Sequence, residues 1–246
     1  MSGDQAAFGD RPALLRFLRE VGALQFGAIT LRSGRVSPYF FNSARFQTGA
    51  QLERLGAYYA AAISRAAPQA TVVFGPAYKG IPLCATASMA LARQTGREIG
   101  YLFNRKEAKT HGDGGQFVGR TPGPADRLVL VDDVITDGGT KLEAVELLRA
   151  NFSNPIDALV IAFNRMETDA AGEDAVARFE QATGVPVVAL LTVADLEAEL
   201  EAERAAAAPG TPGVVGPEVL AEIRAYRARY GVAPAAGATR PGPHTP

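Results

Sequence analysis

Short apolar runs alternate with helical segments along most of the chain, and this alternation constrains the fold more than any other feature. Apolar runs that fit strands lie at residues 71–74, 99–103, 128–131, 158–163 and 185–191. Segments typical of helices join them at residues 50–67, 81–95, 140–150 and 174–183. Strands that are apolar throughout, and that are separated by helices of about ten or more residues, predict a parallel sheet covered by helices on both faces. The predicted fold class is therefore α/β.

The segment before this alternation predicts a smaller unit. Residues 14–21 carry apolar side chains at helical spacing and end before Gly22, so we expect a helix there. Residues 24–31 and 38–41 predict two short strands around a polar turn. Together with the helix they form an expected N-terminal subdomain, called the hood, which covers about residues 1–48.

The rest of the chain is expected to complete a single domain over residues 1–233. The α/β core covers about residues 49–207, with a further helix at its end, and a C-terminal helix covers about residues 217–231. A Pro/Gly-rich stretch at residues 209–216 separates these two helices. Residues 234–246 contain Pro, Gly and Ala without periodicity, so this tail is expected to be disordered.

Composition excludes several classes of partner and site. Lys plus Arg number 25 against 26 Asp plus Glu, so there is no overall basic field of the kind that drives nucleic-acid binding. Cys84 is the only cysteine, which excludes an intramolecular disulfide and a cysteine-rich zinc site. The N-terminus lacks the apolar stretch of a signal peptide, and the apolar run at residues 185–191 is far shorter than the roughly 20 residues that span a bilayer. We therefore expect a cytoplasmic protein with no nucleic-acid or membrane partner.

The loop after residues 128–131 carries the strongest functional signal, because ligands of an open parallel sheet bind beyond the carboxyl ends of its strands. It consists, in order, of Asp132, Asp133, Val134, Ile135, Thr136, Asp137, Gly138, Gly139 and Thr140. The glycines let backbone N–H groups converge on an anion, the threonines add hydroxyl donors, and the following helix contributes the positive end of its dipole. The two leading carboxylates would repel phosphate, so they are expected to accept hydrogen bonds from sugar hydroxyls or metal-bound water. The pattern predicts a site for a ribose 5-phosphate.

Two other interpretations of this loop stay open at this point. Asp132 and Asp133 could simply end a strand and cap a helix, as acids do in many α/β proteins. They could also hold magnesium in a nucleotide hydrolase, which requires a second motif. The chain has no G-x-x-x-x-G-K-S/T loop, and no G-x-G-x-x-G follows the first α/β strand, so the P-loop and dinucleotide interpretations are disfavoured.

Two further loops carry charge at predicted strand ends. The first, residues 75–80, contains Tyr78 and Lys79, although a lone lysine in a turn is typical of a solvated surface. The second, residues 104–125, lacks periodicity and is expected to be a mobile lid or an ordinary flexible basic loop. Its cationic side chains are Arg105, Lys106, Lys109 and His111. Because the other histidine, His244, lies in the tail, His111 is the only histidine available for catalysis in the folded region.

The string LVLVDDVITDGGT at residues 128–140 resembles the diphosphoribose-binding motif of the type I phosphoribosyltransferases. Four further stretches narrow the resemblance to the orotate phosphoribosyltransferase family, over almost the entire chain. These are TLRSGRVSPYFFN at residues 30–42, FGPAYKGIP at 74–82, FNRKEAKTHGDGG at 103–115 and AYRARYGV at 225–232. The resemblance implies the type I phosphoribosyltransferase fold, a mostly parallel sheet flanked by helices with a small hood subdomain.

The resemblance also implies roles for the residues that match. The diphosphoribose donor is expected to contact the whole loop from Asp132 to Thr140 and a set of cationic or aromatic side chains. That set is Arg32, Tyr78, Lys79, Arg105, Lys106, Lys109 and His111. Lys109, His111 and Asp133 are the expected catalytic residues. Arg32 stands where the family has a lysine, and Asp137 stands where bacterial members often have a small residue.

Orotate is expected to lie against the backbone of Phe40 and Phe41, with Thr136 nearby and Arg165 pairing with its carboxylate. An arginine after a strand could also be part of a surface ion pair. The reaction that the resemblance implies joins N1 of orotate to C1 of 5-phosphoribosyl 1-diphosphate and releases diphosphate, with magnesium bound mainly through the diphosphate of the substrate rather than by a protein metal site. It also implies a homodimer in which the lid of one chain covers the Asp132/Asp133 loop of the other.

Two alternatives are distinguishable from this assignment. A phosphoribosyltransferase for a purine or for uracil would not need the PYFFN segment or Arg165. A regulator that senses diphosphoribose and binds DNA or RNA would show an added domain or a basic face, and neither the net charge of −1 nor the N-terminal residues indicate one.

Overall fold

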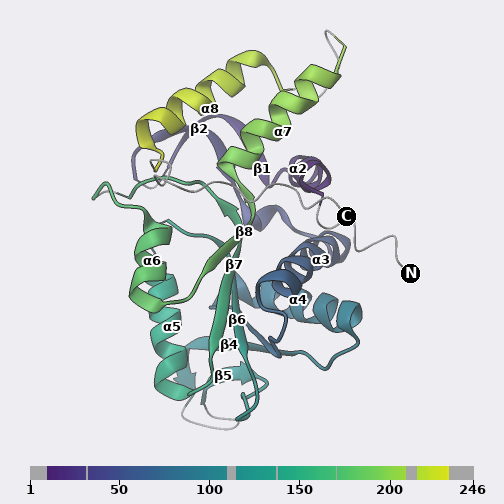
Figure 1. The fold of residues 1–246 in the computed structure, drawn as a ribbon, viewed down its shortest axis with the longest axis vertical. Helices are drawn as coiled ribbons and strands as arrows, with labels where there is room; N and C mark the ends of the chain where they lie inside the picture. The colour runs from purple at the N-terminus through teal and green to yellow at the C-terminus, as the bar shows by residue number, and fades with distance from the viewer. Residues whose placement is uncertain are drawn as a thin grey trace.

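A single six-stranded sheet forms the centre of the molecule in the computed structural model, which describes residues 10–31, 33–109, 115–136, 138–169, 171–208 and 215–232. The strand order is β5-β4-β3-β6-β7-β8, and all neighbours are parallel except β5, which runs antiparallel to β4 (Figure 1). The strands are β3 (Val72–Phe74), β4 (Gly100–Lys109), β5 (Gly115–Gly119), β6 (Leu128–Val134), β7 (Ile156–Asn164) and β8 (Val187–Thr192). The predicted α/β class is confirmed.

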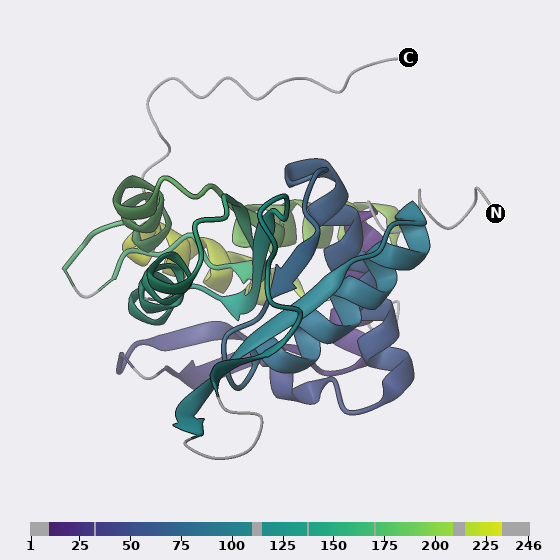
Figure 2. The ribbon, with the colours of Figure 1, turned by 90° about the horizontal axis from the view of Figure 1, so that it is seen from below.

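Helices cover both faces of the sheet, as the apolar strands require. They are α3 (Gly49–Ala66), α4 (Gly80–Thr95), α5 (Gly139–Asn151) and α6 (Ala175–Thr183). Seen from below, α3 and α4 lie on one side of the strands and α5 and α6 on the other (Figure 2). None of the helices within the described residues is long and apolar enough to cross a membrane.

Alternation along each strand divides the core into two clusters. Val72 and Phe74 of β3 pack with the buried residues of α5 and α6, while Val73 between them packs with those of α3 and α4. Successive side chains of a strand point to opposite faces, so a fully apolar strand supplies both clusters at once. This explains why β3 and most of β6 have no exposed side chain and read as continuous apolar runs.

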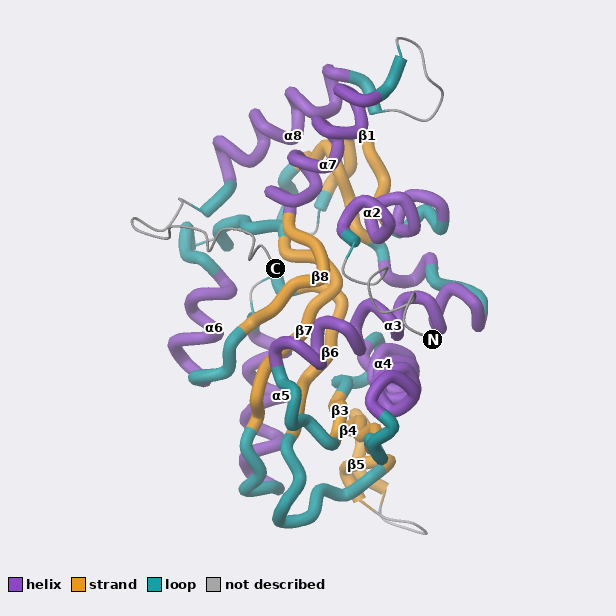
Figure 3. The backbone as a smooth tube through the Cα atoms, turned by 45° about the vertical axis from the view of Figure 1, so that its right-hand side comes forward, coloured by secondary structure: helices purple, strands orange, loops and turns teal. Residues whose placement is uncertain are grey.

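The hood contains a second, two-stranded antiparallel sheet of β1 (Leu24–Thr30) and β2 (Val36–Phe41), preceded by α2 (Arg11–Glu20). The C-terminal helices α7 (Val193–Ala206) and α8 (Pro217–Tyr230) lie beside this sheet and complete the upper part of the molecule (Figures 1 and 3). The hood is therefore built from both ends of the chain. The proposed domain boundaries stay a prediction.

The expectation that residues 104–125 lack regular structure is wrong in part. Strand β4 continues to Lys109, and β5 pairs with it in an antiparallel hairpin, with Phe103 opposite Val118 and Lys109 opposite Gly115. The hairpin forms the edge of the sheet and is half exposed, so its side chains need not alternate between apolar and polar. Backbone hydrogen bonding holds such a hairpin, and apolar periodicity does not reveal it. The tip, residues 110–114, lies outside the described residues.

Close packing between α3 and α4 depends on Gly56. A Cβ added at Gly56 would lie 2.6 Å from the backbone oxygen of Thr86 in α4, whereas a Cβ added at Gly49 of the same helix would meet nothing within 4 Å. The Gly56→Ala substitution should therefore lower the free energy of unfolding by about 1–3 kcal/mol, because a backbone atom cannot move aside as a flexible side chain would. Gly49→Ala is the matched control, with an expected change of about 0.5 kcal/mol or less. Urea denaturation of both variants measures the difference, and equal stabilities would show that the helices are not held at this contact.

Candidate active site

Two adjacent carboxylates lie buried at the carboxyl end of β6. Asp132 and Asp133 are each only 4% exposed. The Asp132 side chain accepts a hydrogen bond from the backbone N–H of Asp133 at 2.8 Å, and the Asp133 side chain accepts one from the N–H of Val134 at 2.8 Å. Buried carboxylates need such donors, because an ion without them carries a large desolvation cost.

Asp133 is held by two segments distant in sequence. Its Oδ2 accepts hydrogen bonds from Lys79 Nζ at 2.8 Å and from Ser43 Oγ at 2.7 Å. Lys79 is the residue that precedes α4, and Ser43 follows the hood strand β2. The loop after β3 and the exit of the hood therefore meet at the end of β6, as expected for neighbouring parallel strands.

Asp132 has a separate set of contacts. Its Oδ2 forms an ion pair with Lys141 Nζ at 2.6 Å, and Lys141 lies in the first turn of α5. The backbone oxygen of Asp132 accepts a hydrogen bond from the hydroxyl of Tyr59, a fully buried residue of α3, at 2.7 Å. Each acid thus has its own lysine: Lys79 precedes α4, and Lys141 lies in α5.

These contacts move the pKa values of the two acids in opposite directions. Burial raises the pKa of Asp132, and this effect together with the adjacent Asp133 outweighs the attraction of Lys141. Burial also acts to raise the pKa of Asp133, but hydrogen bonds from Lys79 and Ser43 outweigh it and lower the pKa overall. Asp133 is therefore the acid that stays ionised most firmly, and Asp132 is the one that takes up a proton first.

The loop from Ile135 to Gly138 leads into the N-terminus of α5, an arrangement that suits an anion-binding site. Gly138 has a φ of 78°, which favours glycine, and it stands at the N-cap of α5 without a side-chain cap. The N-terminus of a helix attracts an anion through its backbone N–H groups and its dipole, so the start of α5 is the part of this loop that suits a phosphate. Thr136 and Thr140 are exposed, whereas Ile135 packs into the cluster beneath α5 and α6. Asp137 lies outside the described residues.

The loop between β3 and α4 contacts β4 through both backbone and side-chain groups. The backbone N–H of Ala77 donates to Asn104 Oδ1 at 3.0 Å, and Lys106 Nζ lies 5.0 Å from the centre of the Tyr78 ring, a cation–π geometry. Tyr78 is 67% exposed, so its ring is accessible to a ligand. Within the described residues, the buried Nε of Arg105 has no hydrogen-bond partner, which leaves an unfilled donor on this side of the site.

The hood reaches the end of β7 through aromatic contacts. Phe41 is buried and stacks on Phe163 at a centroid distance of 5.8 Å, while Phe40 is half-buried. Arg165, just after β7, is 9% exposed and lies over the ring of Tyr39, with its Cζ 4.3 Å from the centroid. The interpretation of Arg165 as a surface ion pair is therefore wrong, because its guanidinium is buried between the hood and the sheet.

The structure brings together part of the predicted site. Lys79 meets Asp133, Tyr78 meets Lys106, and Phe41 and Arg165 lie at the neighbouring strand end. Arg32 and His111 lie outside the described residues, and so does the side chain of Lys109, whose backbone ends β4.

The residues that sequence reasoning missed are those that hold the predicted ones. They are Ser43, Tyr59, Lys141 and Glu167. Lys141 directly follows the predicted cradle, and Glu167 stands two residues after Arg165, so their positions next to predicted site residues were the available signal. Ser43 and Tyr59 carried no such signal.

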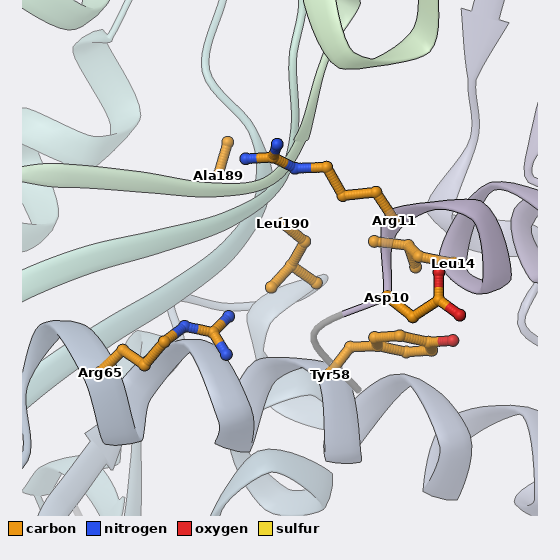
Figure 4. A pocket seen from close by; sticks show the side chains of 7 residues that line it. All are labelled: Asp10, Arg11, Leu14, Tyr58, Arg65, Ala189 and Leu190. Atoms are coloured by element: carbon orange, nitrogen blue, oxygen red, sulfur yellow. The ribbon is translucent and has the colours of Figure 1, made fainter. Parts of the chain in front are cut away.

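A cavity of about 290 Å³ lies elsewhere, between α2, α3 and β8 (Figure 4). It is lined by none of the predicted site residues. Asp10 at its rim accepts a hydrogen bond from Ala13 N and so caps α2, and Arg11 pairs with Asp195 at 3.2 Å. These two polar side chains therefore have structural contacts, and the strand-end site remains the candidate.

Comparisons with known proteins show which family the chain matches. Residues 43–182 match the family model described as "Phosphoribosyl transferase domain". The chain is 43% identical over 218 residues to the orotate phosphoribosyltransferase of Thioalkalivibrio sulfidiphilus, covering 89% of this chain and 96% of the relative. It is 44% identical over 219 residues to that of Halorhodospira halophila, with the same coverage. The crystal structure of the Francisella tularensis enzyme of that name superposes with a TM-score of 0.75 at 32% identity, covering 89% of this chain and 98% of the other.

Removing the Lys141 charge should make stability depend on pH in a defined direction. In Lys141→Met, Asp132 loses the cation that lowers its pKa, so the folded-state pKa rises further above the unfolded value of 3.8. The deficit relative to the unaltered protein should be about 3 kcal/mol near pH 7 and should shrink as the pH falls through that raised pKa, because a protonated Asp132 no longer needs a cation. Urea denaturation of both proteins, from pH 7 down through the raised pKa of Asp132, measures this difference in the free energy of unfolding.

Lys141→Arg is the control for this experiment. It keeps a positive charge at the start of α5, so its pH profile of stability should follow that of the unaltered protein more closely. A deficit in Lys141→Met that is the same at every pH would contradict the ion pair as its source.

Proposed function

The chain belongs to the phosphoribosyltransferase family, and on that premise we propose that it is an orotate phosphoribosyltransferase of pyrimidine (UMP) synthesis. It transfers the 5-phosphoribosyl group from 5-phosphoribosyl 1-diphosphate to N1 of orotate, giving orotidine 5'-phosphate and diphosphate. The observation that carries the proposal is the Asp132/Asp133 pair beside the N-terminus of α5, with Lys79 at the neighbouring strand end. The choice of orotate rests on relatives that bear that name along nearly the whole chain.

The sugar phosphate is proposed to bind across the end of β6. Asp132 and Asp133 accept hydrogen bonds from the ribose hydroxyls, and the 5-phosphate sits in the loop from Thr136 to Thr140 at the start of α5. This division follows from charge, because the acids repel the phosphate while the helix terminus attracts it. For the ribose to reach Asp133, Lys79 must release it.

Lys79 is then proposed to bind the diphosphate. As the bond between C1 and the diphosphate oxygen breaks, the leaving group gains negative charge, and Lys79, Arg105 and Lys106 lie on the side of the site where they can neutralise it. Lys109 and His111 are proposed to join them. No covalent enzyme intermediate is needed, because the nitrogen of orotate is itself the nucleophile.

Magnesium is proposed to enter with the substrate. Asp132 and Asp133 offer the hard oxygen ligands that magnesium prefers, but each already has a lysine partner. Within the described residues no three acidic, histidine or cysteine side chains gather into a metal site. The donor set therefore fits an ion that is carried mainly by the diphosphate oxygens and that supplies charge neutralisation of the leaving group.

Orotate is proposed to lie between the hood strand β2 and the end of β7, against the backbone of Phe40 and Phe41 with Thr136 at its edge. Arg165 is proposed to pair with its carboxylate. A cytoplasmic location is part of the same proposal, because UMP synthesis needs no export and the single buried thiol of Cys84 suits a reducing compartment.

An absorbance assay of orotate consumption tests the assignment. Orotate should disappear only when both magnesium and 5-phosphoribosyl 1-diphosphate are present, because the nucleophile alone has no activated sugar to attack. Hypoxanthine and uracil serve as control bases. Turnover of either control without turnover of orotate would replace the proposed substrate, and no turnover of any base would favour the sensing regulator.

We also propose a homodimer with shared active sites. The β4–β5 hairpin lies at the edge of the sheet and is half exposed, with Phe117 of β5 packed against Phe74 and Phe152. A two-fold dimer automatically gives each hairpin a neighbouring site. In this arrangement the Lys109 end of one chain lies over the Asp132/Asp133 loop of the other.

Mixing two inactive variants tests the shared site. Lys109→Ala removes a hairpin charge, and Asp133→Asn damages the ribose contact, so each homodimer should be nearly inactive. In a mixed dimer with sites shared between chains, one site carries both lesions and the other carries neither. Subunit exchange should then restore about a quarter of the unaltered activity in a random equal mixture. No recovery after confirmed exchange would contradict the shared site.

A further inference from the structure

Glu167 connects four parts of the molecule through one carboxylate. Its Oε1 accepts hydrogen bonds from Arg165 Nε at 2.8 Å and from the Tyr39 hydroxyl at 3.2 Å. Its Oε2 accepts one from the Tyr226 hydroxyl at 3.1 Å and lies 3.8 Å from Arg35 Nη1. These groups come from β2, the turn before it, the segment after β7, and α8.

The cluster is well shielded from solvent, which strengthens its contacts. The side chains of Arg165 and Glu167 are 10% and 13% exposed. Burial is the main reason that the pKa values of Tyr39 and Tyr226 lie above their ordinary value, so both hydroxyls remain neutral donors to Glu167. Glu167 is therefore the carboxylate that balances the charge of Arg165 in this cluster.

The backbone between Arg165 and Glu167 is constrained as well. Met166 has a φ of 51°, a left-handed conformation that is uncommon for a residue other than glycine. Its N–H donates to Asn164 Oδ1 at 2.8 Å, and its carbonyl accepts from Val232 N at 2.9 Å, just beyond α8. Strained conformations persist where the surroundings hold them, and they occur often at functional sites.

These contacts occupy one edge of the Arg165 guanidinium. Nε and Nη2 face Glu167, and Nη2 also donates to Ser37 Oγ at 2.8 Å. Nη1 donates to the backbone oxygen of Tyr39 at 3.3 Å, a longer contact than those of Nε and Nη2. A guanidinium carries two N–H groups on Nη1, and the Tyr39 oxygen accepts from only one of them. The held edge fixes the plane of the group, and the Nη1 side remains for a ligand.

We propose that Glu167 is a positioning residue for base selection: it holds the guanidinium of Arg165 by its Nε/Nη2 edge so that Nη1 presents a fixed donor to the carboxylate of the base. The inference rests on the proposed function, since it needs orotate as the substrate. Through Tyr226 it also makes helix α8 a support of the base site, although α8 supplies no proposed substrate contact. A base without a carboxylate would gain nothing from this arrangement.

A purely structural cross-link is the competing explanation, and the kinetic constants separate the two. Glu167→Gln keeps the shape and one acceptor but removes the charge that fixes Arg165. The KM for orotate should rise about tenfold, with the KM for 5-phosphoribosyl 1-diphosphate changed less than about twofold, because only the base contact loses its orientation. Tyr226→Phe should shift the KM for orotate in the same direction by a smaller factor.

Glu197→Gln is the matched control. Glu197 pairs with Arg227 at 3.0 Å and so joins α7 to α8 by a similar ion pair, without contact to Arg165. If a looser attachment of α8 alone caused the higher KM, Glu197→Gln would raise the KM for orotate as much as Glu167→Gln does. That result would overturn the positioning role. The expected result is a KM for orotate within about twofold of the unaltered protein.

A double-substitution cycle tests whether Glu167 acts through Arg165. Adding Glu167→Gln to Arg165→Ala should raise the KM for orotate no further, because the group to be positioned is already absent. A second rise of similar size would overturn the proposal, as would a Glu167→Gln variant that raises the KM values of both substrates equally. Orotate turnover by the unaltered protein is measured first: its absence overturns the proposed function and this inference together, whereas its presence with an unchanged KM in Glu167→Gln overturns this inference alone.

Discussion

Burial of two adjacent carboxylates at the end of β6 is the constraint on which the rest of the structure depends. Each ion would cost several kcal/mol to remove from water without compensation. Compensation comes from Lys79 before α4, Lys141 in α5 and Ser43 after the hood strand β2. Because these residues lie far apart in sequence, the acids reach their low-energy state only when the helices, the sheet and the hood are all in place. The site and the fold are therefore stabilised by the same contacts.

The two lysines differ in a way that matters for binding. The side chain of Lys79 is 66% exposed, whereas that of Lys141 is 13% exposed. An exposed ammonium loses little when it exchanges one anion for another, so Lys79 can leave Asp133 for the diphosphate that is proposed to bind there. Lys141 is shielded and stays with Asp132, which keeps one acid neutralised beside the phosphate cradle. The two lysines thus lie close to the proposed positions of the substrate's charged groups.

The order of apolar and polar residues along the chain predicted the parts of the fold in which each element's burial follows from its own sequence. Apolar runs such as residues 128–131 predicted the parallel strands because burial on both faces leaves a continuous apolar signature. The β4–β5 hairpin escaped prediction because an edge hairpin is held by backbone pairing. In the site, the loop from Asp132 to Thr140 carried its own chemical signal. Ser43 did not, because its contact with Asp133 spans 90 residues and only the assembled hood creates it.

The register of β2 links the proposed sugar site to the proposed base site. Ser37 and Tyr39 of this strand contact Arg165, and Ser43, shortly after its end, contacts Asp133. In the antiparallel pair, Tyr39 is opposite Phe26 and Phe41 is opposite Leu24. A slip of one residue would turn Ser37, Tyr39 and Phe41 to the opposite face of the hood sheet, which would remove the contacts to Arg165 and Phe163. It would also shift the chain that carries Ser43. A movement of the hood therefore acts on the subsites of both substrates at once, and Glu167, joined to Tyr39 and Tyr226, ties that movement to α8.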